Sequence, residues 1–109
     1  RVYISGLSMG GYGTFDLVSH RPNLFAAAAP ICGGADLELL NNAVGVPFWI
    51  FHGDSDRVVS VEKSRDAFNF LIKERDHHKY TEYKGVYHNS WNSVFEEEDY
   101  FKWLFSKSR

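Results

Sequence analysis

The chain has 109 residues, a net charge of -2 and an aromatic content of 17%, which suit one globular domain and argue against intrinsic disorder. Acidic and basic residues are spread along the chain, so it has no basic stripe for a nucleic-acid backbone, and no apolar run approaches the length of a membrane span. Cys32 is the single cysteine, which excludes an internal disulfide and a multi-cysteine zinc site.

The first elements expected are a strand and a helix. Residues 2–5 are a β-prone run that predicts a short buried strand. Residues 9–20 are predicted to form a helix, which ends before Pro22 because proline cannot continue a helix. The chain opens at Arg1 and enters the strand at once, so we expect it to be the second half of a longer protein.

The middle of the chain predicts two more strands. Residues 25–31 are small and apolar, as in a fully buried strand. Residues 36–46 are expected to form a surface excursion with one helical turn. Residues 47–52 are again apolar and are predicted to form a third strand, ended by Gly53.

The last part predicts helix, strand and helix. Ser60 is a good N-cap for a helix that ends near residue 75, and residues 79–83 alternate as a fourth strand does. Ser93 and Glu96 have the spacing of a capping box, which predicts that the last helix begins there. Its expected core face consists of Val94, Phe101, Leu104 and Phe105.

The predicted order of elements indicates an α/β fold. The strands are apolar runs rather than alternating ones, which is typical of a mostly parallel sheet covered by helices on both faces. About four strands and three helices are expected. The sequence contains no internal repeat and no linker, so we interpret residues 1–109 as one partial domain.

The stretch ISGLSMGG carries the first chemical signal. Gly6-x-Ser8-x-Gly10, between a predicted strand and a predicted helix, is the nucleophile elbow pattern. Side chains at the two glycine positions are expected to collide with the neighbouring strand and helix. The turn places Ser8 at a helix N-terminus, where free N–H groups favour negative charge, and the Met9 amide is the expected oxyanion donor.

Two later loops offer the base and the acid that a serine nucleophile needs. Asp54 and Asp56 follow the third predicted strand, and His88 follows the fourth. The carboxyl ends of parallel strands meet at one edge of a sheet, so these side chains are predicted to converge with Ser8. Spacing alone leaves both aspartates open as the acid.

The other histidines are interpreted as structural or solvated residues rather than as the base. His52 ends a buried strand and is interpreted as a satisfied core histidine. His77 and His78 follow a charged helix end and are expected to be solvated, and His20 lies near another helix terminus. Combined with the aspartates, they match no common metal-ligand spacing, so no metal and no cofactor are expected.

Four runs, RVYISGLSMGGYGTFDLVSHRP, AAAAPICGG, VPFWIFHGDSDRVVSVEKS and YTEYKGVYHNSW, resemble the carboxyl-terminal half of α/β-hydrolases. More narrowly, the chain resembles the bacterial esterases related to polyhydroxybutyrate depolymerases, feruloyl esterases and predicted peptidases. This resemblance implies that Ser8 is the nucleophile, Asp56 in the HGxxDxxV run is the acid, and His88 is the base. A full member begins with further strands and a loop that supplies a second oxyanion donor, which this chain lacks.

The resemblance also suggests walls for a substrate pocket. Met9, Ile31 and Cys32 lie where acyl-pocket walls are expected, with Cys32 buried and inert because Ser8 already fills the place of the nucleophile. A tryptophan follows the histidine loop in the resembling esterases. Trp91 is therefore expected either to line the pocket beside His88 or to pack under the last helix.

The function predicted is that of a serine hydrolase that cleaves small-molecule or polysaccharide-linked carboxylic esters through an acyl-enzyme, without nucleic-acid or membrane partners. One alternative is a peptidase of the prolyl-oligopeptidase type, which has the same order of Ser, Asp and His. The other is a non-catalytic piece that associates through an open sheet edge, as a homodimer or with an amino-terminal half. The localisation stays open, with secreted and periplasmic both compatible.

Overall fold

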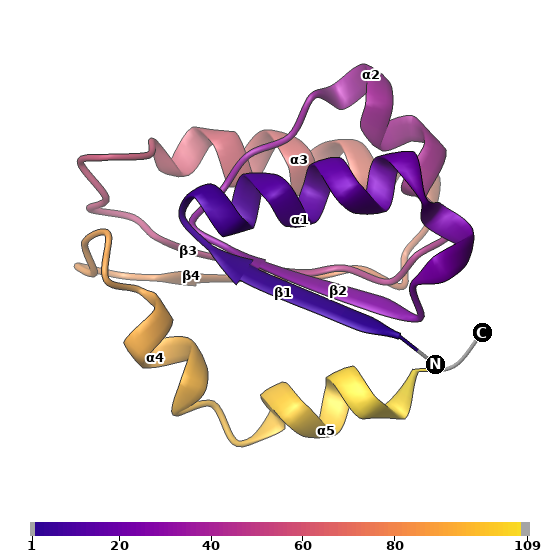
Figure 1. The fold of residues 1–109 in the computed structure, drawn as a ribbon. Coiled ribbons are helices and arrows are strands. Elements are labelled where there is room, and N and C mark those ends of the chain that lie inside the picture. The colour runs from indigo at the N-terminus through magenta and orange to yellow at the C-terminus, as the bar shows by residue number, and fades with distance from the viewer. Residues whose placement is uncertain (1, 108–109) are drawn as a thin grey trace.

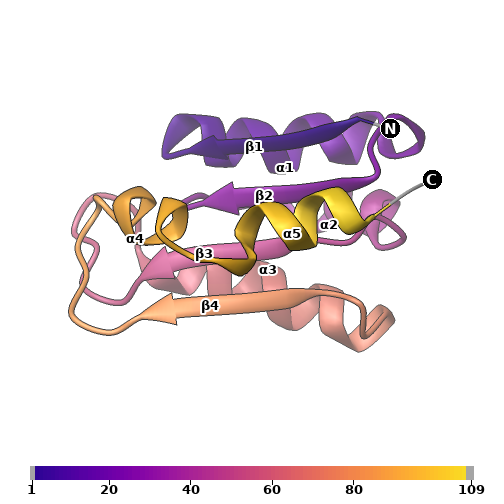
Figure 2. The ribbon, with the colours of Figure 1, turned by 90° about the horizontal axis from the view of Figure 1, so that it is seen from below.

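A computed structural model describes residues 2–107 as a single sheet with helices on both faces. The four strands are parallel and lie in the order β1-β2-β3-β4. They are β1 (Tyr3–Leu7), β2 (Ala27–Ile31), β3 (Trp49–Gly53) and β4 (Lys79–Tyr83). All four carboxyl ends meet at the same edge of the sheet (Figure 2). The predicted α/β class is confirmed.

The helices divide into two layers (Figure 1). One face of the sheet is covered by α1 (Met9–His20), α2 (Leu37–Leu40) and α3 (Val61–Glu74), and the other by α4 (Trp91–Phe95) and α5 (Asp99–Ser106). Short 3-10 turns occupy Pro22–Leu24 and Asn41–Ala43. Ser60 caps α3, as predicted, by accepting a hydrogen bond from the Glu62 amide.

The core consists of two apolar clusters, one on each side of the sheet. Every residue of β2 and β3 is buried, because alternate side chains of these central strands point into opposite clusters. The cluster under α1, α2 and α3 contains Phe15, Val18, Phe48, Ile50 and Leu71 among others. The cluster facing α4 and α5 contains Ile31, Cys32, Phe51, Tyr100 and Leu104 among others.

The first strand lies at an edge of the sheet, which corrects the prediction that it is buried. Within residues 2–107, β1 pairs with β2 alone, and its last residue, Leu7, is 37% exposed. Association of copies through this edge stays a prediction, which a sizing measurement would test. No helix within residues 2–107 is long and apolar enough to cross a membrane.

The carboxyl-terminal segment forms two helices where one was predicted. Ser93 lies inside α4 rather than capping a helix, and α5 begins later, after Glu98. Val94 of α4 and Leu104 of α5 both pack in the cluster on this face of the sheet. Residues 96–98 separate the two helices, and the predicted capping box is wrong.

Two phenylalanines of α5 do not join the core as predicted. Phe101 and Phe105 are 53% and 55% exposed. Their rings stack on each other with centroids 6.0 Å apart, and the ring of Phe105 also contacts the ring of Tyr3. The buried side of this helix belongs instead to Tyr100 and Leu104.

His78 is buried, which overturns the prediction that it is solvated. Its side chain is held against backbone groups of the segment that leads into β3, and the residue is 4% exposed. The Phe48 amide donates to Nδ1 at 3.2 Å, and Nε2 lies 3.1 Å from the Val44 carbonyl oxygen. Burial, and next the neighbouring charge of His77, lower the pKa of His78 to about 4. The fold therefore holds this imidazole neutral.

The neutral state of His78 predicts a loss of stability in mild acid. An unfolded histidine binds its proton near pH 6.5, whereas folded His78 resists protonation down to about pH 4. The unfolded state therefore gains protons first, and the free energy of unfolding should fall by about 3 kcal/mol as the pH drops through this window. Urea titrations at several pH values measure this slope.

His78→Asn is the matched control for that slope. The asparagine carbonyl can still accept the hydrogen bond from the Phe48 amide, but it does not titrate. The variant should be less stable at pH 7 because the contact with Val44 is lost, and its stability should change less between pH 6.5 and 4. Equal slopes in both proteins would contradict the assignment.

Candidate active site

Ser8 lies on the sharp turn between β1 and α1. Its backbone has φ 56° and ψ -117°, a conformation that strains a residue with a Cβ by about 1–3 kcal/mol. Two hydrogen bonds hold the turn, from the Ser8 amide to the Ile31 carbonyl at 3.0 Å and from the Gly11 amide to the Ser8 carbonyl at 2.9 Å. The strained turn presents the hydroxyl at the carboxyl edge of the sheet.

The two glycines of the pattern have different roles. A Cβ at Gly6 would lie 2.3 Å from the carbonyl oxygen of Gly10, so a side chain cannot fit there. A Cβ at Gly10 would meet no atom within 4 Å. The predicted collision therefore holds for Gly6 and is wrong for Gly10.

This difference predicts opposite effects on stability for two alanine substitutions. Gly6→Ala should lower the free energy of unfolding by about 1–3 kcal/mol, because the elbow backbone must shift to admit the methyl group. Gly10→Ala should raise it by about 0.5–1 kcal/mol, since the helix loses a flexible glycine and nothing clashes. Denaturant titration of both variants tests the pair. Equal effects would contradict the steric account.

Ser8, His88 and Asp56, which we call the triad, form one chain of hydrogen bonds. The Ser8 Oγ lies 2.8 Å from the His88 Nε2, and the His88 Nδ1 lies 2.8 Å from the Asp56 Oδ2. Ser8 follows β1, Asp56 follows β3 and His88 follows β4. The structure thus brings together the three residues that the sequence singled out.

The carboxylate of Asp56 is enclosed and firmly held. Its side chain is 0% exposed, and its Oδ1 accepts hydrogen bonds from the amides of Val58 at 2.8 Å and Val59 at 2.9 Å. Burial alone would raise the pKa of Asp56, but the hydrogen bonds from His88, Val59 and Val58 outweigh it and leave the pKa below its ordinary value. Asp56 is therefore ionised at neutral pH.

Asp54, the other aspartate open as the acid, contacts a different partner. Its Oδ1 accepts a hydrogen bond from the Gly85 amide at 2.7 Å and another from the Ser55 hydroxyl at 3.0 Å. It therefore ties the loop after β3 to the loop that carries His88. The geometry places Asp56, and not Asp54, against the imidazole.

The loop that carries His88 packs closely on the end of β3. A Cβ at Gly53 would lie 2.2 Å from the Val86 carbonyl oxygen, and that oxygen accepts a hydrogen bond from the Ser55 amide at 3.0 Å. Below the loop, the Cys32 thiol donates to the His88 carbonyl at 3.7 Å. Only a glycine at position 53 leaves room for the backbone of the His88 loop to pack this closely on the end of β3. This contact fixes the position of the loop that carries the imidazole.

The predicted substrate-contacting residues lie in two environments. Met9 is 86% exposed beside the hydroxyl of Ser8, whereas Ile31 and Cys32 are 1% and 0% exposed. Ile31 is part of the core facing α4 and α5, so this structure places it away from any open surface. Trp91, the first residue of α4, packs partly against the same core and meets the His88 ring edge to face with ring centroids 5.5 Å apart, and its role as a pocket wall stays a prediction.

One group of donor atoms within residues 2–107 has the spacing of a metal site. The donors of Cys32, Asp56 and His88 lie within 4.8 Å of one another. Asp56 and His88 already bond to each other, and burial raises the pKa of the Cys32 thiol, which disfavours the thiolate that metals bind. The donor set fits a proton relay better than a metal, and we assign no metal to it.

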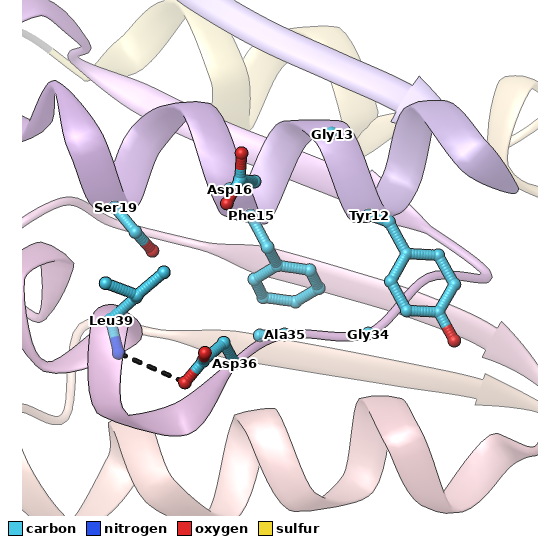
Figure 3. Close-up of a pocket in the computed structure, with 9 residues that line it drawn as sticks. All are labelled: Tyr12, Gly13, Phe15, Asp16, Ser19, Gly34, Ala35, Asp36 and Leu39. Carbon is cyan, nitrogen blue, oxygen red and sulfur yellow. Dashed lines mark hydrogen bonds between the residues drawn. The ribbon is translucent and has the colours of Figure 1, made fainter.

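A pocket of about 350 Å³ lies between α1 and the segment leading into α2 (Figure 3). Asp36 caps α2 there by accepting hydrogen bonds from the Glu38 and Leu39 amides. The lining includes no triad residue. We therefore regard the pocket as separate from the candidate active site.

Sequence reasoning missed one neighbour of the triad. His52, interpreted as a core histidine, is indeed buried, but its Nε2 also lies 3.3 Å from the Asp56 Oδ2. The two residues are four positions apart at the end of a strand, and this spacing could have pointed to the contact.

The family comparison points to hydrolases. Residues 17–94 match the family model described as serine aminopeptidase, S33. The matched range contains Asp56 and His88 and begins after Ser8. Among curated proteins, an uncharacterized secreted protein of Arthroderma benhamiae is 29% identical over 91% of this chain and 14% of its own length.

Solved structures share the fold. The crystal structure of a thermostable esterase matches with a TM-score of 0.96 and 42% identity over 100% of this chain and 31% of the esterase. A variant of Arabidopsis thaliana SOBER1 matches with a TM-score of 0.71 and 25% identity. The match covers 96% of this chain and 50% of the SOBER1 chain. An acylaminoacyl peptidase of Pyrococcus horikoshii matches with a TM-score of 0.72 over 83% of this chain and 20% of the peptidase chain. Its sequence identity is 17%, so this match shows likeness of fold alone. The chain spans half or less of each relative.

Proposed function

The chain belongs to the serine aminopeptidase S33 family of α/β-hydrolases, and on this premise we propose that it supplies the nucleophile, base and acid of a serine esterase. The observation that carries the proposal is the unbroken chain from the Ser8 Oγ through the His88 imidazole to the Asp56 carboxylate, with both links at 2.8 Å. The thermostable esterase, at 42% identity, supports esters as the substrate class.

The acylation step follows from the positions of the protons. The Asp56 Oδ2 accepts a hydrogen bond from the Nδ1–H of His88, which keeps that proton on Nδ1 and leaves Nε2 free to take the hydroxyl proton of Ser8. The Ser8 oxygen attacks the ester carbonyl carbon, and the resulting oxyanion accepts a hydrogen bond from the Met9 amide at the start of α1. When the intermediate collapses, His88 returns the proton to the departing alcohol and an acyl group remains on Ser8.

Deacylation repeats the sequence with water. His88 takes a proton from a water molecule as its oxygen attacks the acyl carbon, and the proton returns to the Ser8 oxygen when the carboxylic acid leaves. The buried, charged Asp56 stabilises the imidazolium in both steps. A second oxyanion donor is expected from a preceding part of the full-length enzyme.

The proposal is tested on the protein expressed from its complete coding sequence. A fluorophosphonate probe should label Ser8, as located by peptide mass spectrometry, and the protein should hydrolyse p-nitrophenyl acetate. Ser55, whose hydroxyl donates to the carboxylate of Asp54 rather than to an imidazole, is the internal control for unspecific labelling. Absence of label at Ser8 would refute the proposal.

Peptide hydrolysis is the second candidate. It is favoured by the description of the matching family as serine aminopeptidases, and the same triad can attack an amide. The assay compares kcat/KM for an aminoacyl p-nitroanilide and for p-nitrophenyl acetate. A higher value for the anilide would replace the esterase proposal with the peptidase one while leaving the triad in place.

A further inference from the structure

A second histidine lies behind the triad. His52 is the next-to-last residue of β3 and is 0% exposed. Its Nε2 lies 2.8 Å from the Val59 carbonyl oxygen and 3.3 Å from the Asp56 Oδ2. Its Nδ1 lies 2.7 Å from the hydroxyl of Ser64 on α3. The imidazole therefore connects helix α3 to the carboxylate of the triad.

The contacts of His52 determine which nitrogen carries the proton. Two oxygens face Nε2, so a lone pair there would be repelled by both, whereas an N–H can be shared between them. Nδ1 can then accept a hydrogen bond from the Ser64 hydroxyl, which in this arrangement turns its proton from the Gly33 carbonyl oxygen at 3.1 Å to the imidazole at 2.7 Å. Burial lowers the pKa of His52, despite the opposing effects of the Val59 carbonyl and the Asp56 charge. We assign the neutral Nε2–H tautomer from this network.

This tautomer completes the hydrogen bonding of Asp56. The Oδ1 accepts from two backbone amides, Val58 and Val59. The Oδ2 accepts from the His88 Nδ1 at 2.8 Å and faces the His52 Nε2 at 3.3 Å. A carboxylate has about four lone-pair sites, and an Nε2–H shared between Val59 and Asp56 would add a fourth donor to the three hydrogen bonds that Asp56 already accepts.

We propose that His52 is a positioning residue, whose Nε2–H, anchored through Ser64 to α3, holds the Asp56 carboxylate plane so that Oδ2 faces the Nδ1 of His88. The inference rests on the proposed function, because positioning matters only if the triad acts. Without this donor the carboxylate is fixed from three sides and can rotate away from the imidazole. A displacement of about 1 Å in such a relay lowers turnover about 100-fold.

Two substitutions of His52 separate positioning from packing. Glutamine can place an amide N–H near the position of Nε2, whereas leucine fills the space with no donor. His52→Leu should lower kcat for p-nitrophenyl acetate about 10- to 100-fold with KM unchanged, and His52→Gln should restore kcat to within about 3-fold of the wild type. Equal losses in both variants, or no loss in either, would overturn the proposal.

A second readout does not depend on turnover. The Nδ1 proton of His88, held by Asp56, should give a low-field proton resonance that persists in His52→Gln and broadens or disappears in His52→Leu. If the wild type hydrolyses no ester, the proposed function fails while this resonance still tests positioning. An unchanged resonance in His52→Leu would refute positioning even in an active enzyme.

Ser64→Ala serves if His52→Leu does not fold. It removes the hydroxyl that lies 2.7 Å from Nδ1 and 3.1 Å from the Gly33 carbonyl oxygen, and it leaves Nε2 and Asp56 in place. A fall in kcat at unchanged KM, with recovery in Ser64→Thr, supports the anchored chain. Wild-type kcat in Ser64→Ala would overturn the role given to α3.

Discussion

Replacing Ser8 or His88 by alanine is expected to lower kcat for ester hydrolysis by about six orders of magnitude. Ser8→Ala removes the attacking oxygen. His88→Ala removes the nitrogen that lies 2.8 Å from that oxygen and accepts its proton. Each substitution stops the same step, so the double variant should be no slower than either single one.

Burst and steady-state kinetics with p-nitrophenyl acetate measure these losses in the protein expressed from its complete coding sequence. His20→Ala is the matched histidine control, because His20 bonds on the surface of α1 to Asp16 and lies outside the triad. It should keep kcat within a few-fold. Full activity in Ser8→Ala would end the serine mechanism, and additive losses in the double variant would mean that Ser8 and His88 act separately.

Asp56→Asn is expected to lower kcat by about four orders of magnitude with little change in fold. The amides of Val58 and Val59 both donate to Oδ1, so the new side chain must turn its carbonyl oxygen toward them. Its NH2 group then faces the Nδ1 of His88, which has to accept rather than donate. The imidazole proton then lies on Nε2, so Nε2 has no lone pair left to accept the hydroxyl proton of Ser8.

Asp54→Asn is the control for this substitution. Asp54 accepts from the Gly85 amide and the Ser55 hydroxyl, and an asparagine oxygen can keep the first of these bonds. We expect kcat within about 10-fold of the wild type. A large loss in Asp54→Asn with a small one in Asp56→Asn would reverse the assignment of the acid.

The order of elements was predictable because each signal is local. The apolar runs of β2 and β3 predict strands buried on both faces, and the structure buries every residue of both. The glycine-serine pattern marked the elbow before any coordinate was known, because a tight strand-to-helix turn demands special backbone conformations. The loops of Asp56 and His88 followed from the rule that parallel strands end at one edge.

The predictions that failed depended on the partners that the folded chain brings to each residue. The Ser93 and Glu96 spacing fits a helix start, but in the structure Ser93 lies inside α4 and Glu96 follows its last residue. His78 has the surroundings of a solvated residue in the sequence, yet the fold places a backbone amide and a carbonyl against its ring. Local propensity carries no information about such partners.

The sequence by itself determined the order of the four strands and of the helices up to α3, the tight turn at Ser8, and which loops would meet, since these follow from short-range sterics and the pattern of apolar residues. Only the tertiary structure decided between Asp54 and Asp56, showed that Gly6 but not Gly10 must be a glycine, and set His52 against the carboxylate. The physical reason is that hydrogen bonds and close contacts form over distances of about 3 Å. Sequence spacing cannot resolve such distances between segments that are far apart in the chain.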